Sequence, residues 1–156
     1  MQTNINKIFK NFESTGTKTF SLADDPPVFV EGHGSTLIDT KAKKYIDMAT
    51  GSAVSILGHG HKKISLALQK QLNTGISHLG PHFHTKPHIE IFKKLRILFP
   101  KEFTHFHPAT NGTEATEVAL KAAMYKTDRS QFLAFWGSYH GRTSGSLAVS
   151  SLKGGN

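Results

Sequence analysis

Residues 103–136 decide the fold: FTHFHPATNGTEATEVALKAAMYKTDRSQFLAFW. An alternating apolar run, Phe103 to His107, opens the stretch, and a continuous apolar run, Gln131 to Trp136, closes it. The second run is of the kind that is buried on both faces of a parallel sheet. Between the two runs we expect a helix from Thr113 to Tyr125, because apolar residues recur on one face at Ala115, Val118, Ala119 and Ala122. A strand, a helix and a strand at this spacing predict a βαβ unit with two parallel strands.

Short strands and further helices are expected before this unit. The sequence predicts three strands in an antiparallel meander, at residues 28–30, 36–38 and 45–48. The turn between the last two runs from Asp39 to Lys43. Helical spacing predicts a helix over Ile64 to Leu72, and a second one that begins near Pro87 and ends before Pro100.

These elements predict an α/β chain in two parts. Residues 1–60 form an N-terminal segment that holds the meander, and residues 61–156 begin a large doubly wound α/β domain. Two parallel strands leave both faces of a sheet open, so strands that are apolar on both faces need neighbours. We therefore expect these residues to be a fragment, or one half of something larger.

Composition excludes several classes of function. The 156 residues carry 19 Lys and Arg against 11 Asp and Glu, a formal net charge of +8. The basic residues fall in short clusters without interleaved aromatic side chains, which is typical of solvated surface rather than of a nucleic-acid interface. Without cysteine there is no disulfide, thiolate metal site or cysteine nucleophile. Pairs such as His59 with His61 lack the carboxylates that would complete a metal site, so we expect no metal.

The sequence also carries no signal for a membrane. Met1 to Phe12 lacks the continuous apolar run of a secretory signal. No uncharged window approaches the ~18 apolar residues that a membrane span requires. We expect a cytoplasmic protein that does not cross a membrane.

The residues before the long helix suit an anion. Asn111-Gly112-Thr113-Glu114 places successive backbone N–H groups at the positive end of a helix, where a phosphate can dock. Gly112 allows a close approach to the backbone, and Thr113 adds a hydroxyl donor. The same residues also fit an ordinary capping box formed by Asn111 and Glu114. The two interpretations are compatible if the Glu114 carboxylate turns back towards Asn111.

A polar and aromatic turn, Trp136 to Thr143, follows the second expected strand. Open α/β sheets bind ligands at the carboxyl ends of their strands. Tyr139 offers a ring face for a planar heterocycle, and Arg142 offers a two-pronged donor for a carboxylate. A rim aromatic and a surface ion pair are the alternatives at these two positions. A phosphate site beside an aromatic platform predicts a flat phosphorylated cofactor.

Five segments in a fixed order carry a resemblance to a known family: GSTLID at 34–39, YIDM at 45–48, LGHGH at 57–61, NGTEATE at 111–117 and YHGRT at 139–143. From about Val28 onwards the sequence resembles the class III pyridoxal-phosphate-dependent aminotransferases of fold type I. This family includes acetylornithine, ornithine and 4-aminobutyrate aminotransferases. The resemblance implies a small α+β segment followed by the first βαβ unit of the large doubly wound domain.

The resemblance implies pyridoxal 5'-phosphate as the cofactor and gives residues roles towards it. Gly112 and Thr113 match the pair that holds the phosphate, and Tyr139 matches the aromatic residue stacked on the pyridine ring. His140 is placed in the same cofactor-binding motif without a chemical role of its own. Arg142 matches the arginine that grips the substrate carboxylate. The implied reaction moves an amino group from an amino acid or amine donor to a 2-keto acid, and the implied assembly is a homodimer.

The sequence departs from the family pattern at several positions. Asn111 stands where many relatives have Ser, Lys62 stands where Pro is usual, and Lys41-Ala42 replaces the usual Asp-Gly turn. The resemblance places the Schiff-base lysine beyond position 156. No catalytic residue is therefore expected within these residues, and by themselves they should not transaminate.

Two alternatives differ from a transaminase. One is a non-catalytic product or module that binds a cofactor or a partner without turnover. The other lies within the family: a glutamate semialdehyde aminomutase keeps both amino groups on one substrate. A lysine-bearing second half would separate the enzymes from the module.

Overall fold

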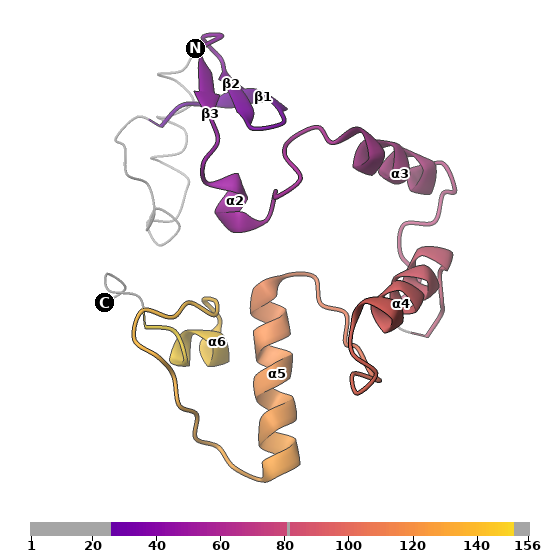
Figure 1. Cartoon of the computed structure of the whole chain (residues 1–156), viewed down its shortest axis with the longest axis vertical. Coiled ribbons are helices and arrows are strands. Elements are labelled where there is room, and N and C mark those ends of the chain that lie inside the picture. The colour runs from indigo at the N-terminus through magenta and orange to yellow at the C-terminus, as the bar shows by residue number, and fades with distance from the viewer. Residues whose placement is uncertain (1–25, 81, 152–156) are drawn as a thin grey trace. The chain divides into compact units, whose positions relative to one another are not determined.

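The computed structural model describes residues 26–80 and 82–151 (Figure 1). The chain divides into two compact units, residues 1–80 and residues 81–156. Among the described residues, the first unit holds a three-stranded sheet and the helices α2 and α3, and the second holds α4, α5 and α6. The segment Met1 to Phe12 lies outside the described residues, and the division after residue 60 stays a prediction.

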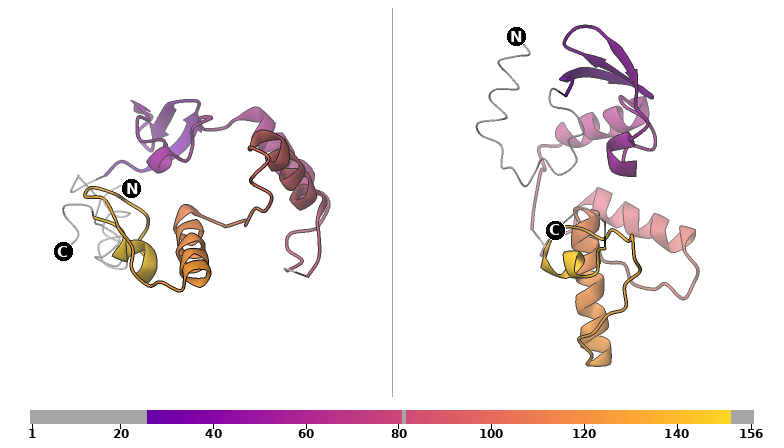
Figure 2. Two further views of the ribbon diagram at one scale, coloured as in Figure 1. Left: turned by 60° about the horizontal axis from the view of Figure 1, so that its bottom comes forward. Right: turned by 90° about the vertical axis from the view of Figure 1, so that its left-hand side faces the viewer.

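The sheet in the first unit is the predicted antiparallel meander. Its strands are β1 (Phe29–His33), β2 (Thr36–Asp39) and β3 (Lys44–Ile46), in the order β1-β2-β3 (Figures 1 and 2). Gly34 lies in the two-residue turn between β1 and β2 with a φ of 57°, a conformation that glycine adopts without steric cost. All three predicted strands are therefore confirmed, with boundaries shifted by one to three residues.

Asp39 organises the turn between β2 and β3. Its side chain accepts hydrogen bonds from the N–H groups of Lys41 (2.8 Å) and Lys43 (2.9 Å) and from the Tyr45 hydroxyl (3.0 Å). Desolvation raises the pKa of Asp39, but the hydrogen bonds from Lys43, Lys41 and Tyr45 lower the pKa by more, so the net pKa lies below its ordinary value. The predicted turn is confirmed, and one carboxylate that is 3% exposed holds it.

Asp47 ends β3 two residues earlier than the sequence predicts. Its Oδ1 atom accepts hydrogen bonds from the N–H groups of Ala49 (3.0 Å) and Thr50 (2.8 Å), which turn the chain out of the sheet. The helix α2 (Thr50–Ala53) follows, and its residues have positive φ values between 48° and 64°. This element is a left-handed turn that the sequence did not indicate.

Asp47 also ties the segment after β3 to the sheet. Its Oδ2 atom accepts a hydrogen bond of 2.7 Å from Nε2 of His59. His59 in turn exchanges two backbone hydrogen bonds with Gly34, of 2.8 and 2.9 Å. The side chains of Asp47 and His59 are only 8% and 29% exposed, so solvent screens this pair less than a surface pair.

The helices follow their predicted positions. α3 (Lys62–Leu72) begins two residues before the predicted Ile64, α4 (Lys86–Leu98) has Pro87 in its first turn and ends before Pro100, and α5 (Gly112–Thr127) contains the predicted range. A further short helix, α6 (Ser144–Ala148), lies beside α5 in both views of Figure 2. The helical periodicity therefore predicted the three long helices correctly.

The two strands of the expected βαβ unit are not formed in the described residues. Residues 103–107 and 131–135 belong to no helix or strand, Trp136 begins a turn, and Leu133 and Trp136 are 102% and 94% exposed. A strand exists only where a neighbour accepts its backbone hydrogen bonds, and the described residues contain no such neighbour for either segment. The prediction of these two strands is wrong here, although the helix between them is confirmed.

Burial is low throughout the described part of the chain. No hydrophobic side chain there is buried, and the apolar stripes of α3 and α4 remain accessible, with Leu68 60% and Ile89 45% exposed. None of the helices in the described ranges is long and apolar enough to span a bilayer. Hydrogen bonds, among them several to carboxylates, hold the described turns and loops in place.

Replacing Ala42 by glycine is expected to stabilise the protein. Ala42 has a φ of 61°, and a residue with a Cβ atom pays about 1–2 kcal/mol in this region. Glycine removes that cost but adds roughly 0.4–1 kcal/mol of unfolded-state entropy, so we expect A42G to raise the free energy of unfolding by about 0.5–1 kcal/mol in urea denaturation. A119G, in the interior of α5, is the control and should lower it by about 1 kcal/mol. A destabilising A42G would contradict the left-handed turn.

Removing the His59 ring is expected to raise the pKa of Asp47. That pKa lies below its ordinary value of 3.8 because His59 donates to the carboxylate, as does the Thr50 N–H. The depressed folded-state pKa contributes stability that is complete above 3.8 and is lost as the pH falls through the lower value.

NMR titration of the Asp47 carboxyl carbon checks this in H59A. The control is H33A, because His33 pairs with Glu31 at 3.5 Å with both side chains mostly exposed. We expect the Asp47 midpoint to rise in H59A and to stay in H33A. Equal midpoints in all three proteins would rule out the pair as the cause of the shift.

Candidate functional site

The N-terminus of α5 is capped as the sequence predicts, with one difference. Asn111 is the N-cap residue, and its side-chain oxygen accepts a hydrogen bond of 2.9 Å from the Glu114 N–H. The Glu114 carboxylate turns back past Asn111 and accepts instead from the N–H (2.7 Å) and the hydroxyl (2.5 Å) of Thr110. These hydrogen bonds, the hydroxyl first, lower the pKa of Glu114. The negative charge of Glu114 is thus held at Thr110, the residue before the N-cap.

The first two N–H groups of α5 are available to a ligand. Neither the Gly112 N–H nor the Thr113 N–H donates to an acceptor among the described residues. A Cβ atom added at Gly112 would meet no atom within 4 Å, so the space beside this backbone is open. Unpaired N–H groups at the positive end of a long helix are a general site for phosphate and carboxylate groups.

The loop after residue 136 is held by its own hydrogen bonds rather than by a sheet. Gly137 donates to the Ser151 carbonyl (3.0 Å), and Ser151 donates back to the Ser138 carbonyl (2.9 Å). The His140 N–H donates to the Ser150 hydroxyl at 2.9 Å. These bonds fold residues 137–151 into one compact unit that includes α6.

Gly141 brings this loop against the start of α5. A Cβ atom added at Gly141 would lie 2.6 Å from the Thr113 hydroxyl oxygen and 2.6 Å from the Ser146 hydroxyl oxygen. The φ of Gly141 is 136°, and the residue is buried. Only a residue without a side chain fits here, so the two predicted cofactor-binding segments are in contact at Thr113 and Gly141.

The remaining predicted site residues lie on the same loop. Tyr139 is 51% exposed, and Arg142 is also exposed. His140 is exposed, and its contact with Ser150 runs through its backbone, so the structure gives its imidazole no bonded role among the described residues. Gly112 and Thr113 come from α5, and Tyr139, His140 and Arg142 from the loop that Gly141 packs against it.

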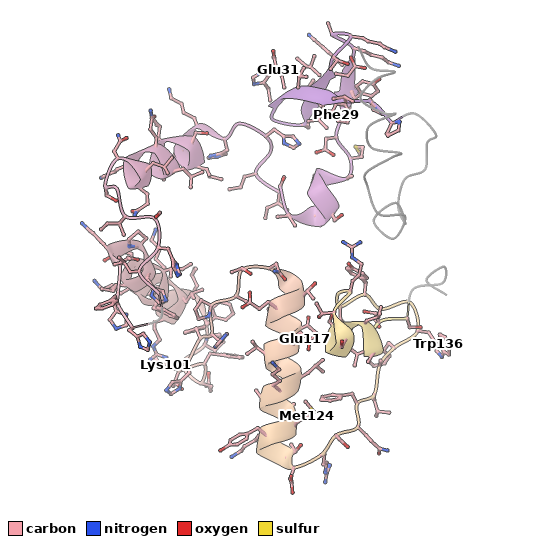
Figure 3. All side chains as sticks on the ribbon, turned by 180° about the vertical axis from the view of Figure 1, so that it is seen from behind. Phe29, Glu31, Lys101, Glu117, Met124 and Trp136 are labelled. Atoms are coloured by element: carbon pink, nitrogen blue, oxygen red, sulfur yellow. The ribbon has the colours of Figure 1, made fainter. Side chains whose placement is uncertain are left out.

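Glu117 is a residue of this site that the sequence analysis did not assign. It lies four residues after Thr113, on the same face of α5, and Figure 3 shows it on the side that faces α6. Its Oε1 atom accepts hydrogen bonds from the Thr143 hydroxyl and from the N–H groups of Gly145 and Ser146, both at 2.9 Å. The i to i+4 spacing from Thr113 was the available signal, but the sequence did not indicate the partner loop.

Within residues 26–80 and 82–151, no three side chains of His, Asp and Glu come together in a group that could hold an ion. The groups at the candidate site are backbone N–H groups, hydroxyls, the Tyr139 ring, the His140 imidazole and the Arg142 guanidinium.

The sequence and structure match known aminotransferases over most of the chain. The model of the family described as aminotransferase class-III matches residues 21–155. The chain belongs to the class-III aminotransferase family.

Individual members of the family show how much is matched. The chain is 38% identical over 120 residues to a [LysW]-aminoadipate semialdehyde/glutamate semialdehyde transaminase of Sulfurisphaera tokodaii, covering 77% of this chain and 31% of the relative. It is 34% identical over 124 residues to an acetylornithine aminotransferase of Methanopyrus kandleri, covering 80% and 32%. The chain therefore spans about a third of the length of these class-III aminotransferases.

A solved structure confirms the fold class. The adenosylmethionine-8-amino-7-oxononanoate aminotransferase of Methanocaldococcus jannaschii is 25% identical in sequence and superposes with a TM-score of 0.81. The match covers 96% of this chain and 36% of that chain. The described residues thus have the fold of the matching part of a class-III aminotransferase, even where the two expected strands are unpaired.

Substituting Gly141 by alanine is expected to separate the two segments of the site. G141A forces a Cβ atom onto Thr113 and Ser146, and overpacking of this kind costs about 1–3 kcal/mol beyond the backbone strain. The matched control is G137A, because Gly137 also has a positive φ (79°) but an added Cβ atom meets nothing within 4 Å. Urea denaturation of the native protein should show the larger loss for G141A. Equal losses in the two variants would contradict the contact.

Proposed function

We propose that these residues supply the phosphate-binding and ring-binding part of a pyridoxal-phosphate-dependent transaminase. The reaction would move an amino group from an amino acid or amine donor to a 2-keto acid. The observation that carries the proposal is the contact between Thr113 and Gly141. It joins the open N-terminus of α5 to the loop of Tyr139 and Arg142, and these are the parts that a flat phosphorylated cofactor requires.

The residues at the start of α5 fit a phosphate group. The N–H groups of Gly112 and Thr113 and the Thr113 hydroxyl provide three donors at the positive end of a helix of 16 residues. The carboxylate of Glu114 is bonded to Thr110, so it does not compete for these donors. We assign Gly112 and Thr113 to the phosphate of pyridoxal 5'-phosphate, which supplies an electron sink for amino-group chemistry when it is bound.

The loop residues supply the other contacts of the proposed site. Tyr139 is exposed enough to stack on the pyridine ring, and Arg142 is placed three residues further along to bind the substrate carboxylate. His140 stays with the cofactor-binding residues as part of the same motif, held through its backbone. In this arrangement these residues bind and orient the cofactor and the substrate carboxylate, and they move no proton.

The proposed enzyme also requires a Schiff-base lysine and a second subunit. The resemblance to the family supports a Schiff-base lysine beyond position 156, a homodimer and a location in the cytoplasm. The relatives are about three times as long as the matched region, which fits a lysine in the remaining two thirds. The donor and acceptor then approach a site to which this chain contributes the cofactor-binding face.

Truncating the proposed cofactor contacts is expected to weaken pyridoxal-phosphate binding. T113A removes a hydrogen bond to a charged group, worth about 1.5–3 kcal/mol, so the dissociation constant should rise roughly 10- to 100-fold. Y139A removes an aromatic stacking contact of about 0.5–1.5 kcal/mol, which corresponds to roughly 2- to 12-fold. Titration of the cofactor-free native protein, followed by absorbance, measures both constants.

The chain offers matched controls for both substitutions. Thr127 lies at the opposite end of α5 and bonds the Ala123 carbonyl, and Tyr125 is 93% exposed. T127A and Y125A should leave the dissociation constant unchanged. Unchanged affinity in both T113A and Y139A would overturn the assignment of the site.

A labelling experiment on the native protein tests the reaction itself. With a donor that carries a ¹⁵N amino group and an added 2-keto acid, transamination transfers the label to the new amino acid. An aminomutase keeps the label on one carbon skeleton and needs no keto acid. Absence of both cofactor absorbance and label transfer would favour the non-catalytic module. The intact mass of the same sample tells whether further residues accompany these 156.

A further inference from the structure

The Glu117 carboxylate is the structural link between the two segments of the site. Its Oε1 atom accepts three hydrogen bonds, from the Thr143 hydroxyl and from the N–H groups of Gly145 and Ser146. The two N–H groups belong to the first turn of α6, where a helix has no acceptors of its own. Thr143 and Ser146 form a capping box at this helix start, and the Glu117 side chain of α5 adds an acceptor to it.

The packing around Glu117 leaves little freedom for the loop. A Cβ atom added at Gly145 would lie 2.5 Å from Oε2 of Glu117, so the carboxylate lies directly against that backbone. Ser146 is fully buried, and its hydroxyl accepts a hydrogen bond of 3.1 Å from the Thr143 N–H. Glu117 is partly buried, and the Thr143 hydroxyl and the Ser146 N–H, in that order, lower its pKa. The carboxylate is therefore ionised at neutral pH, and its Oε1 atom accepts all three of these hydrogen bonds.

The position of Glu117 on α5 couples the loop to the phosphate site. Glu117 follows Thr113 by one helical turn, so both side chains lie on the face that meets the loop. Thr113 contacts Gly141, and Glu117 holds Thr143 to Ser146. Tyr139 and Arg142 lie on either side of Gly141, so their backbone is fixed by these two contacts.

We propose that Glu117 is a positioning residue of the enzyme. By holding residues 143–146 it fixes the loop that carries Tyr139 and Arg142 at one distance from the Thr113 hydroxyl. This inference rests on the proposed function for the roles of Tyr139 and Arg142. The hold of Glu117 on the loop rests on the hydrogen bonds alone and is measured separately.

Three substitutions separate the reach of the side chain from its charge. E117A removes the acceptor. E117D keeps the charge but is one methylene shorter, and E117Q keeps the length and one acceptor oxygen but loses the charge. Neutral hydrogen bonds are about half as strong as those to a carboxylate, so E117Q should retain part of the hold. E90A is the control, because Glu90 is an exposed residue of α4 whose one ion pair within residues 26–80 and 82–151 is with Lys93.

The first measurement is amide hydrogen exchange of Gly145 and Ser146 in the native protein, without added substrate. We expect E117A and E117D to accelerate exchange at these two amides, E117Q to do so less, and E90A to leave it unchanged. Unaltered exchange in E117A would overturn the role of Glu117 in holding the loop, whatever the enzyme binds.

The second measurement links the loop to the ligands. In E117A and E117D we expect the pyridoxal-phosphate dissociation constant and the KM for the amino donor to rise about 10- to 100-fold, as misplacement of contact groups by about 1 Å can cause. E117Q should restore both to within about threefold of the parent, since about half of each bond is retained. A merely structural role would lower Tm in E117A and would leave both constants unchanged.

The outcomes distinguish this inference from the proposed function. A parent protein that binds no pyridoxal phosphate and transfers no amino group refutes the proposed function before any variant is made. A parent that does both, with E117A exchange accelerated but both constants unchanged, refutes the positioning role alone. Rescue by E117Q together with loss in E117D supports it.

Discussion

The hydrogen bonds of the Glu117 carboxylate are the interaction on which the packing of residues 137–151 against α5 depends. Residues 131–136 form no strand, so the loop that follows them has no sheet to fix its position. A single oxygen on α5 instead accepts from Thr143, Gly145 and Ser146 and sets the start of α6. Without this acceptor, the Gly145 N–H would lose its partner and the Ser146 N–H would keep only the Thr143 side chain, so the contact between Gly141 and Thr113 would lose part of its support. The N-terminal half of α5 and the loop of residues 137–151 are thereby held together as the two segments of the proposed site.

Carboxylates also fix the conformation of turns in the first unit. Asp39 fixes the turn between β2 and β3 by accepting hydrogen bonds from two N–H groups and the Tyr45 hydroxyl. Asp47 fixes the next turn and binds His59. No hydrophobic side chain is buried among the described residues, so apolar packing does not fix these turns. Short-range hydrogen bonds to an anionic acceptor are directional and stronger than neutral ones, which lets a turn keep one conformation with little burial. The described parts of this class-III aminotransferase chain share that solution.

Local sequence patterns predicted the local structure correctly, whereas the strands that depend on pairing with distant segments were not predicted correctly. The meander and the three long helices were predicted correctly because hydrophobic spacing, turn residues and prolines act within a few positions. The strands expected at 103–107 and 131–136 depend on neighbours that the described residues do not contain, so their composition alone could not form them. The residues of the candidate site also differ in whether the sequence could predict them. The N-cap at Asn111 could be predicted from its spacing to Glu114, whereas Glu117 meets partners more than twenty residues later, and no periodicity reports such a contact.

The motif at 139–143 combines residues that pack against α5 with residues that stay exposed. Two of its residues serve packing: Gly141 admits the Thr113 hydroxyl, and Thr143 donates to Glu117. Two others, Tyr139 and Arg142, remain exposed on the same backbone. Substituting either packing residue would move the exposed pair, so the inward and outward residues of the motif are useful only together. The motif therefore indicates a position relative to α5 as well as a set of side chains, and that position gives the proposed cofactor site its geometry.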